Sequence, residues 1–133
     1  MKKTYHGSCH CGAVRFEADI DLGEGSYRCN CSICRRTRFW PAIVRPEDFR
    51  LLAGEGEMTQ YLFNTRQNQH YFCRRCGVRA FGIGNMPGAG RIYGVNLGCL
   101  EDVEEQELAD APITYVDGIH DRWDAAPAVT RHL

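Results

Sequence analysis

The chain has 133 residues, of which 44% are hydrophobic and 25% charged, and its formal net charge is -1 with a pI of about 6.5. These values are typical of one globular domain, which we expect to span 1–133, and they exclude the strongly basic surface of most nucleic-acid-binding domains. No apolar run approaches the ~20 residues that a membrane span needs, and the opening residues lack the apolar core of a signal peptide. We therefore expect a cytoplasmic protein without a membrane or nucleic-acid partner.

Short stretches that alternate apolar and polar residues recur along the chain between glycines. The first, 13–20, places its apolar residues from Val14 to Ile20 on one face, which predicts a half-buried strand. Three later stretches also predict strands, at 49–54, 58–63 and 91–97. Helical signals are limited to one turn at 32–37 and a short surface helix within 100–110 that begins near Asp102. The pattern predicts a mainly β fold of short antiparallel strands with one or two short helices.

Seven of the eight cysteines lie in three tight clusters, which are Cys9 and Cys11, then Cys29, Cys31 and Cys34, then Cys73 and Cys76. Without a secretory signal, such clusters indicate metal ligands rather than disulfides. A glycine directly follows Cys11 and Cys76, and it permits a tight turn in which backbone amides point at the sulfurs. We expect these two pairs, four cysteines in all, to form a closed structural zinc site that ties the N-terminal segment to the central sheet.

The middle cluster offers only three thiols. Three protein ligands with an open fourth position are the arrangement of a catalytic zinc site. Two alternatives remain open from the residues alone: Cys99 closes the site as a fourth ligand, or the three thiols bind no metal.

Four segments resemble one known family. YHGSCHCGAVRFEA, CNCSICRR, HYFCRRCGVRAFG and VNLGCLEDV occur in this order between Tyr5 and Val103 and are similar to the glutathione-dependent formaldehyde-activating enzymes, whose domain is shared with centromere protein V. The resemblance implies a single zinc-stapled domain of the β-tent type. It implies two zinc ions per chain, and it leaves Cys99 outside both sites. The structural ion would be held by Cys9, Cys11, Cys73 and Cys76, and the catalytic ion by Cys29, Cys31 and Cys34.

The resemblance also implies an activity, the addition of a thiol to formaldehyde, which in reverse is a carbon–sulfur lyase reaction. The expected partners are a small thiol, glutathione in the family, and a small aldehyde. Zinc lowers the pKa of a bound thiol and so supplies the thiolate, which is the competent nucleophile. The aldehyde oxygen is the other candidate for the open position, with zinc as Lewis acid, but three thiolate ligands weaken that acidity. The alternative function is a zinc-stabilised binding module without catalysis.

Two groups of residues after the last ligand have two interpretations each. Arg35, Arg36 and Arg38 could offset the negative charge of the thiolates or bind a substrate carboxylate, although such a run is usually a solvated face. Phe39 and Trp40 could wall the pocket or simply fill the core.

Two further features are open in the same way. His70 could be a partner or proton carrier for the site, or a structural histidine. The C-terminal segment 117–133 could cover the site as a lid or form a surface strand with a loose end. His10, between two ligands, is expected to face solvent.

Overall fold

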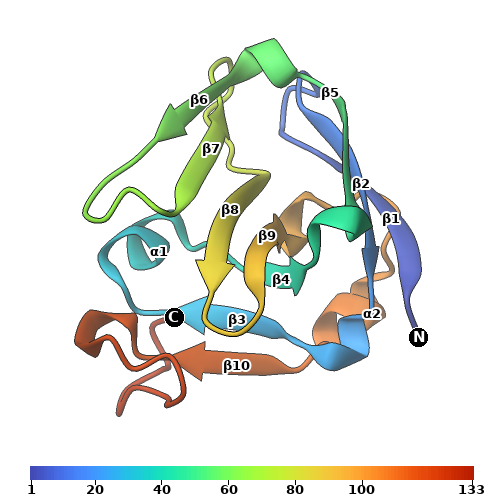
Figure 1. Cartoon of the computed structure of the whole chain (residues 1–133). Helices are drawn as coiled ribbons and strands as arrows, with labels where there is room; N and C mark the ends of the chain where they lie inside the picture. Colours follow the sequence, from blue (N-terminus) through green and yellow to red (C-terminus); the bar gives the residue numbers. More distant parts are fainter.

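The computed structural model describes residues 1–133 and contains three β-sheets and two short α-helices (Figure 1). The strands are β1 (Lys3–Ser8), β2 (Arg15–Ile20), β3 (Ser26–Cys29), β4 (Pro41–Val44), β5 (Phe49–Ala53), β6 (Met58–Tyr61), β7 (Gln69–Cys73), β8 (Phe81–Met86), β9 (Gly90–Asn96) and β10 (Ile113–Val116). The helices are α1 (Ser32–Thr37) and α2 (Glu105–Asp110), and single turns of 3-10 helix occur at Leu22–Glu24, Pro46–Asp48, Glu55–Glu57, Leu97–Cys99 and Gly118–His120. The predicted fold class, mainly β and tent-like with one or two short helices, is confirmed. Neither helix has the length and hydrophobicity that a membrane span requires.

The four predicted strands correspond to β2, β5, β6 and β9, and the predicted turn at 32–37 is α1. Helix α2 begins at Glu105 rather than near Asp102. The Asp102 carboxylate is engaged elsewhere, since it accepts a hydrogen bond from the backbone N–H of His6 at 2.8 Å. The Glu107 side chain instead accepts the backbone N–H of Glu104 at 3.0 Å, which fixes the first turn of α2 at that point.

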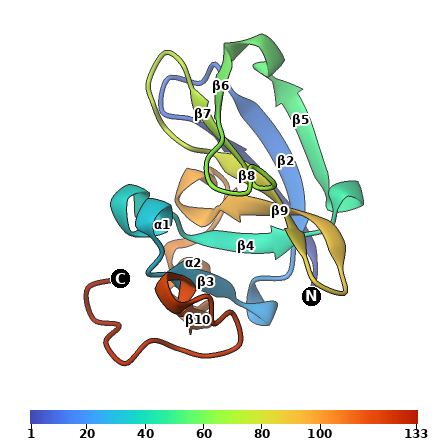
Figure 2. The ribbon, with the colours of Figure 1, turned by 60° about the vertical axis from the view of Figure 1, so that its left-hand side comes forward.

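Two of the sheets are antiparallel, with strand orders β1-β2-β5 and β4-β9-β8-β7-β6. The third is a parallel pair, β3 with β10, in which Val116 lies opposite Cys29. The sequence predicted antiparallel strands only, so this parallel pair was not expected. It arises because β10 lies more than eighty residues after β3 in the chain and returns to pair with it. Its consequence is functional: it brings the C-terminal segment beside the middle cysteine cluster (Figures 1 and 2).

A single cluster of buried side chains fills the space between the two antiparallel sheets. The predicted apolar face of β2 lies in it, and Phe16 is fully buried. Phe49 joins the sheets, since its ring centroid lies 5.5 Å from that of Phe16 and 4.6 Å from those of Phe81 and Tyr93. Aromatic pairs of this geometry add to the stabilisation that apolar burial provides.

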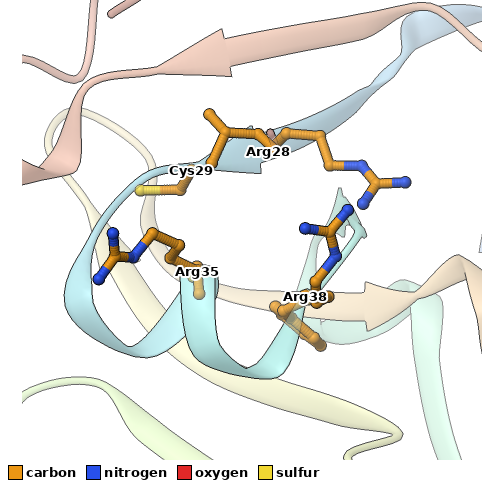
Figure 3. A pocket seen from close by; sticks show the side chains of 7 residues that line it. Arg28, Cys29, Arg35 and Arg38 are labelled. Atoms are coloured by element: carbon orange, nitrogen blue, oxygen red, sulfur yellow. The ribbon is translucent and has the colours of Figure 1, made fainter. Parts of the chain in front are cut away.

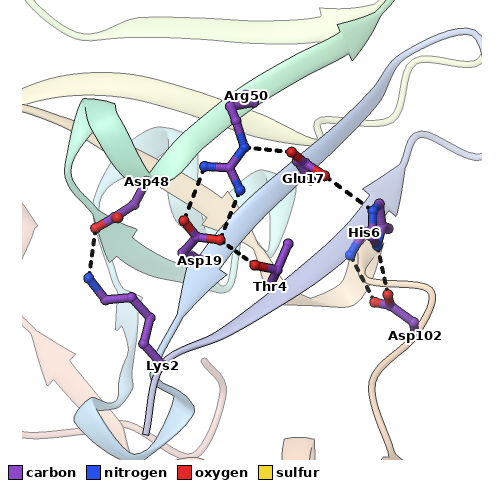
Figure 4. A network of polar contacts seen from close by, with 8 residues as sticks. All are labelled: Lys2, Thr4, His6, Glu17, Asp19, Asp48, Arg50 and Asp102. Carbon is purple, nitrogen blue, oxygen red and sulfur yellow. Dashed lines mark hydrogen bonds and ion pairs between the residues drawn. The ribbon is translucent and has the colours of Figure 1, made fainter.

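A polar network covers the outer face of the three-stranded sheet (Figure 4). Arg50 on β5 donates hydrogen bonds to Glu17 and Asp19 on β2, and the contact with Asp19 is bidentate at 2.8 and 3.1 Å. His6 on β1 lies between Glu17 and Asp102. These contacts fix the register of β1, whose C-terminal end leads into the first cysteine pair.

Candidate metal sites

The two outer cysteine pairs, 62 residues apart in sequence, come together in one group. The Sγ atoms of Cys9, Cys11, Cys73 and Cys76 all lie within 4.8 Å of one another. The Sγ atom of Cys11 is 3.7 Å from that of Cys9 and 3.6 Å from that of Cys73. Tetrahedral zinc with Zn–S bonds of ~2.3 Å places its sulfurs about 3.8 Å apart, so this donor set fits zinc in both chemistry and spacing.

The backbone around the first group points amide hydrogens at the sulfurs. Val14 donates its N–H to Cys9 Sγ at 3.3 Å, and Arg75 donates to Cys73 Sγ at 3.4 Å. Gly12 and Gly77 have φ values of +83° and +78°, which side chains with a Cβ rarely adopt. This is the tight turn that the glycines predict, and it stabilises thiolates over thiols.

The middle cluster forms a second group at the junction of β3 and α1. Cys29 ends β3, Cys31 is the residue before α1, and Cys34 lies in its first turn; their Sγ atoms lie within 4.8 Å of one another. Cys31 donates its N–H to Cys29 Sγ and Cys34 donates to Cys31 Sγ, both at 3.4 Å. Hydrogen bonds from the Cys29 and Cys34 thiols hold the pKa of Cys31 far below its usual range. Three sulfurs with this spacing fit a thiophilic metal such as zinc and leave one tetrahedral position for a further ligand.

Cys99 does not join the second group. It is buried, its Sγ lies 3.9 Å from the carbonyl oxygen of Arg79, and burial raises the pKa of its thiol to about 11. The sulfurs that lie within 4.8 Å of one another in the second group are those of Cys29, Cys31 and Cys34, and Cys99 is not among them. The interpretation of Cys99 as the fourth ligand of the second group is therefore wrong.

The C-terminal segment 117–133 packs directly on the second group. A Cβ atom added to Gly118 would lie 2.6 Å from Cys29 Sγ and 2.8 Å from Cys31 Cβ, so the bare backbone is in contact with the cluster. The segment contains no β-strand, which excludes the surface-strand interpretation. Its position beside α1 and β3 is that of a cover over the site (Figure 2).

A buried polar pair anchors this segment. Asn30, between two of the ligands, donates a hydrogen bond from Nδ2 to Asp117 Oδ1 at 2.9 Å and accepts one from the backbone N–H of Ile119 at 3.1 Å. Both Asn30 and Asp117 are buried. The hydrogen bond from Asn30 holds the pKa of Asp117 below its usual range, so this carboxylate stays ionised and the anchor persists at neutral pH.

A small pocket opens beside the second group, between β3 and α1 (Figure 3). Its volume is about 10 Å³, and it is lined by Arg28, Cys29, Cys34, Arg35, Arg38, Phe39 and Leu133. Three of these seven residues are arginines and none is acidic. Arg36, the remaining arginine of the run, donates to the carbonyl of Ser32 at 2.9 Å and lies outside the pocket. The arginine run is thus divided: Arg35 and Arg38 line the pocket, and Arg36 bonds to the backbone of its own helix.

Sequence reasoning missed the most deeply placed cation of the site, Arg79. Its guanidinium lies 3.8 Å from the centroid of the Phe39 ring and donates to His70 Nδ1 at 2.8 Å. The Nε and Nη1 atoms of Arg79 are buried without a hydrogen-bond partner. Burial lowers the pKa of Arg79, whereas the nearby thiolates of Cys34 and Cys31 raise it. Arg79 is therefore the cation that faces the second group from the protein interior.

The environment of Arg79 also defines His70 and the two aromatic residues. Burial and the charge of Arg79 lower the pKa of His70 to about 4, so its ring is neutral and Nδ1 accepts the Arg79 hydrogen bond. His70 thus orients Arg79 and carries no positive charge at neutral pH. Phe39 lines the pocket, whereas Trp40 packs against the core and donates to Ser26 Oγ at 2.7 Å. His10 is exposed, as expected.

The family described as "Glutathione-dependent formaldehyde-activating enzyme" matches residues 4–117. The chain belongs to this family. A Halomonas elongata protein that bears the family's name is 36% identical over an alignment of 78 residues. The match covers 53% of this chain and 50% of that protein, so it spans half the length of this curated relative. A crystal structure of a Rhodobacter sphaeroides protein is 37% identical, with a TM-score of 0.69, and the match covers 82% of this chain and 99% of that one.

Proposed function

We propose that the protein catalyses the addition of a thiol to a small aldehyde and the reverse carbon–sulfur cleavage, with glutathione and formaldehyde as the first pair to test. The observation that carries the proposal is the second cysteine group, three sulfurs within 4.8 Å of one another beside an arginine-lined pocket, with Cys99 directed elsewhere. The family match adds the reaction class. We place the protein in the reducing cytoplasm, where its cysteines stay available as metal ligands.

We assign a structural zinc to the group of Cys9, Cys11, Cys73 and Cys76, and a catalytic zinc to Cys29, Cys31 and Cys34. A zinc ion held by the second group would lower the pKa of a substrate thiol at the remaining position and thereby supply a thiolate near neutral pH. The first group is closed by four sulfurs, so it contributes to folding rather than to the reaction.

The side chains around the second group would serve the reaction by charge and by shape. Three cysteine thiolates and an incoming substrate thiolate repel one another, and Arg79 offsets this repulsion from the interior. His70 holds Arg79 in place without adding a charge. Gly118 allows the C-terminal segment to cover the cluster closely, which limits water around the reacting atoms.

The reaction needs no redox partner. One carbon–sulfur bond forms, the π electron pair of the carbonyl moves to oxygen, and that oxygen takes up the proton that the thiol released. In reverse, the oxygen loses this proton as the carbon–sulfur bond breaks. Atoms and electrons balance with thiol and aldehyde alone.

The proposal is tested by the rate of adduct formation on the zinc-loaded protein. Thiols add to formaldehyde spontaneously, so exchange between free and adduct ¹³C-formaldehyde is measured by NMR with and without protein. We expect acceleration by the wild type and by Cys99→Ala, whose thiol lies outside the group, and none by Cys31→Ser. A zinc-loaded wild type that leaves the spontaneous rate unchanged would favour a binding module instead.

A further inference from the structure

The pocket beside the second cysteine group is rich in positively charged side chains. Arg28, Arg35 and Arg38 line it, and no acidic side chain does. The ion pairs of the structure engage other arginines, such as Arg50 with Asp19 and Arg75 with Glu57. None of the three pocket arginines has a carboxylate partner among the ion pairs of the structure, and an anion placed among them would offset their mutual repulsion.

Two of these arginines approach each other from opposite walls. Figure 3 shows the guanidinium groups of Arg28, from β3, and Arg38, after α1, at one end of the pocket, while the Cys29 sulfur lies toward the other end. Arg28 lies 5.0 Å from the centroid of the Trp40 ring, which holds its side chain in this direction.

Arg38 is fixed by the backbone as well as by a hydrogen bond. It ends α1 with φ 55° and ψ 38°, a left-handed conformation, and its Nη1 donates to the carbonyl of His132 at 2.7 Å. The rest of its guanidinium remains available to a ligand. Guanidinium groups bind carboxylates through paired, charge-assisted hydrogen bonds, which lysine or a single amide does not reproduce.

We propose that Arg28 and Arg38 form a subsite for the carboxylate of the thiol substrate, and that the preferred substrate is a short mercapto-carboxylate. The proposal rests on the function proposed above in one respect, that the thiol of the ligand occupies the position beside Cys29, Cys31 and Cys34. The pocket then binds the ligand at both ends, with sulfur at the cysteine group and carboxylate at the arginines.

The size of the pocket favours a short ligand. A volume of about 10 Å³ is close to that of one water molecule, and Leu133 forms one wall. A carboxylate larger than one water molecule would have to displace the Leu133 side chain, and a tripeptide such as glutathione would have to displace more of the C-terminal segment. Removal of the Leu133 side chain should therefore strengthen binding of the short ligand.

The test is calorimetric binding to the zinc-loaded protein without aldehyde, which separates this subsite from catalysis. The probes are 3-mercaptopropionate and its neutral analogue of nearly equal shape, 3-mercaptopropionamide. We expect the wild type to bind the carboxylate about 10-fold more tightly or better, as a charge-assisted hydrogen bond permits. Arg28→Gln and Arg38→Gln should bind both probes about equally, and Arg36→Gln should keep the wild-type preference. Leu133→Ala should bind 3-mercaptopropionate more tightly than the wild type does.

Each other outcome overturns the proposal. The first is equal binding of the two probes by the wild type. The second is a loss of carboxylate preference in Arg36→Gln as large as that in Arg38→Gln. The third is binding of glutathione that is tighter than binding of 3-mercaptopropionate and that does not change in Arg38→Gln. If Arg28→Gln fails to bind zinc, the result for Arg38→Gln is used instead, because Arg38 is exposed and its substitution should leave the fold unchanged. If the protein prefers the carboxylate probe but catalyses no thiol addition, the proposed catalysis is refuted and the carboxylate subsite is supported. If it catalyses the addition without preferring the carboxylate probe, the subsite is refuted and the catalysis is supported.

Discussion

Gly118 is the residue at which the smallest chemical change should disturb the second cysteine group alone. An alanine Cβ there would lie 2.6 Å from Cys29 Sγ and 2.8 Å from Cys31 Cβ. Non-bonded heavy atoms prefer separations of about 3.5–4.0 Å, so the cluster or the covering segment has to move by about 1 Å. Zinc sites tolerate deviations of only ~0.2 Å in their bond lengths. The conflict therefore falls on metal binding before it falls on the fold.

We expect Gly118→Ala to lower the zinc affinity of the second group by ~10–100-fold, which is comparable to the effect of removing a side chain that orients metal ligands. Overpacking of this kind costs about 1–3 kcal/mol, so the melting temperature should fall by several degrees. Zinc per chain and thermal unfolding are measured together. Gly56→Ala is the matched control, because no atom lies within 4 Å of its added Cβ and its φ is not positive. Unchanged zinc binding in Gly118→Ala would refute the close approach of this segment to the cluster.

Three further predictions concern the first cysteine group, the ion pair of His6, and Arg79. Cys73→Ser should unfold the protein or lower its melting temperature by far more than Cys31→Ser, because only the first group joins distant segments; equal losses on thermal unfolding would contradict the division into structural and catalytic sites. A hydrogen bond with Asp102 raises the pKa of His6, so the stabilisation by His6 is fully present below pH 6.5 and is lost as the pH rises through the raised value. The difference in melting temperature between the wild type and His6→Asn should therefore be larger at pH 6 than at pH 9, and a constant difference would disprove the linkage. Arg79→Met should weaken zinc binding by ~10-fold or more at the second group only, as judged by chelator competition. An equal effect on both groups would argue against the influence of Arg79 on the Cys34 and Cys31 thiolates.

Local sequence patterns predicted the parts of the fold in which neighbours in the chain decide the structure. The alternation in 13–20 predicted β2, and its apolar face is the buried one. The turn at 32–37 predicted α1 with the correct bounds. The spacing of cysteines and the glycines after Cys11 and Cys76 predicted which sulfurs meet, since a metal site restricts its ligands to a few residue types and short spacings.

Contacts between distant segments were not predictable in the same way. The parallel pairing of β3 with β10 depends on where the chain returns after α2, and four-residue strands carry little periodic signal. The approach of Gly118 to Cys29 follows from this pairing and could not be found without it. Arg79 follows Cys76 closely in sequence, but the thiolates that raise its pKa are Cys34 and Cys31 of the middle group, which are distant in sequence.

The proposed function requires two metal sites of different kinds in one chain, one structural and one catalytic. The decisive measurement is the zinc content of the protein purified under reducing conditions, combined with titration of its accessible thiols. We predict about two zinc ions per chain, of which a mild chelator removes one and thereby exposes the three thiols of Cys29, Cys31 and Cys34. One zinc ion per chain, with three titratable thiols that do not take up added zinc, would contradict the catalytic assignment of that group.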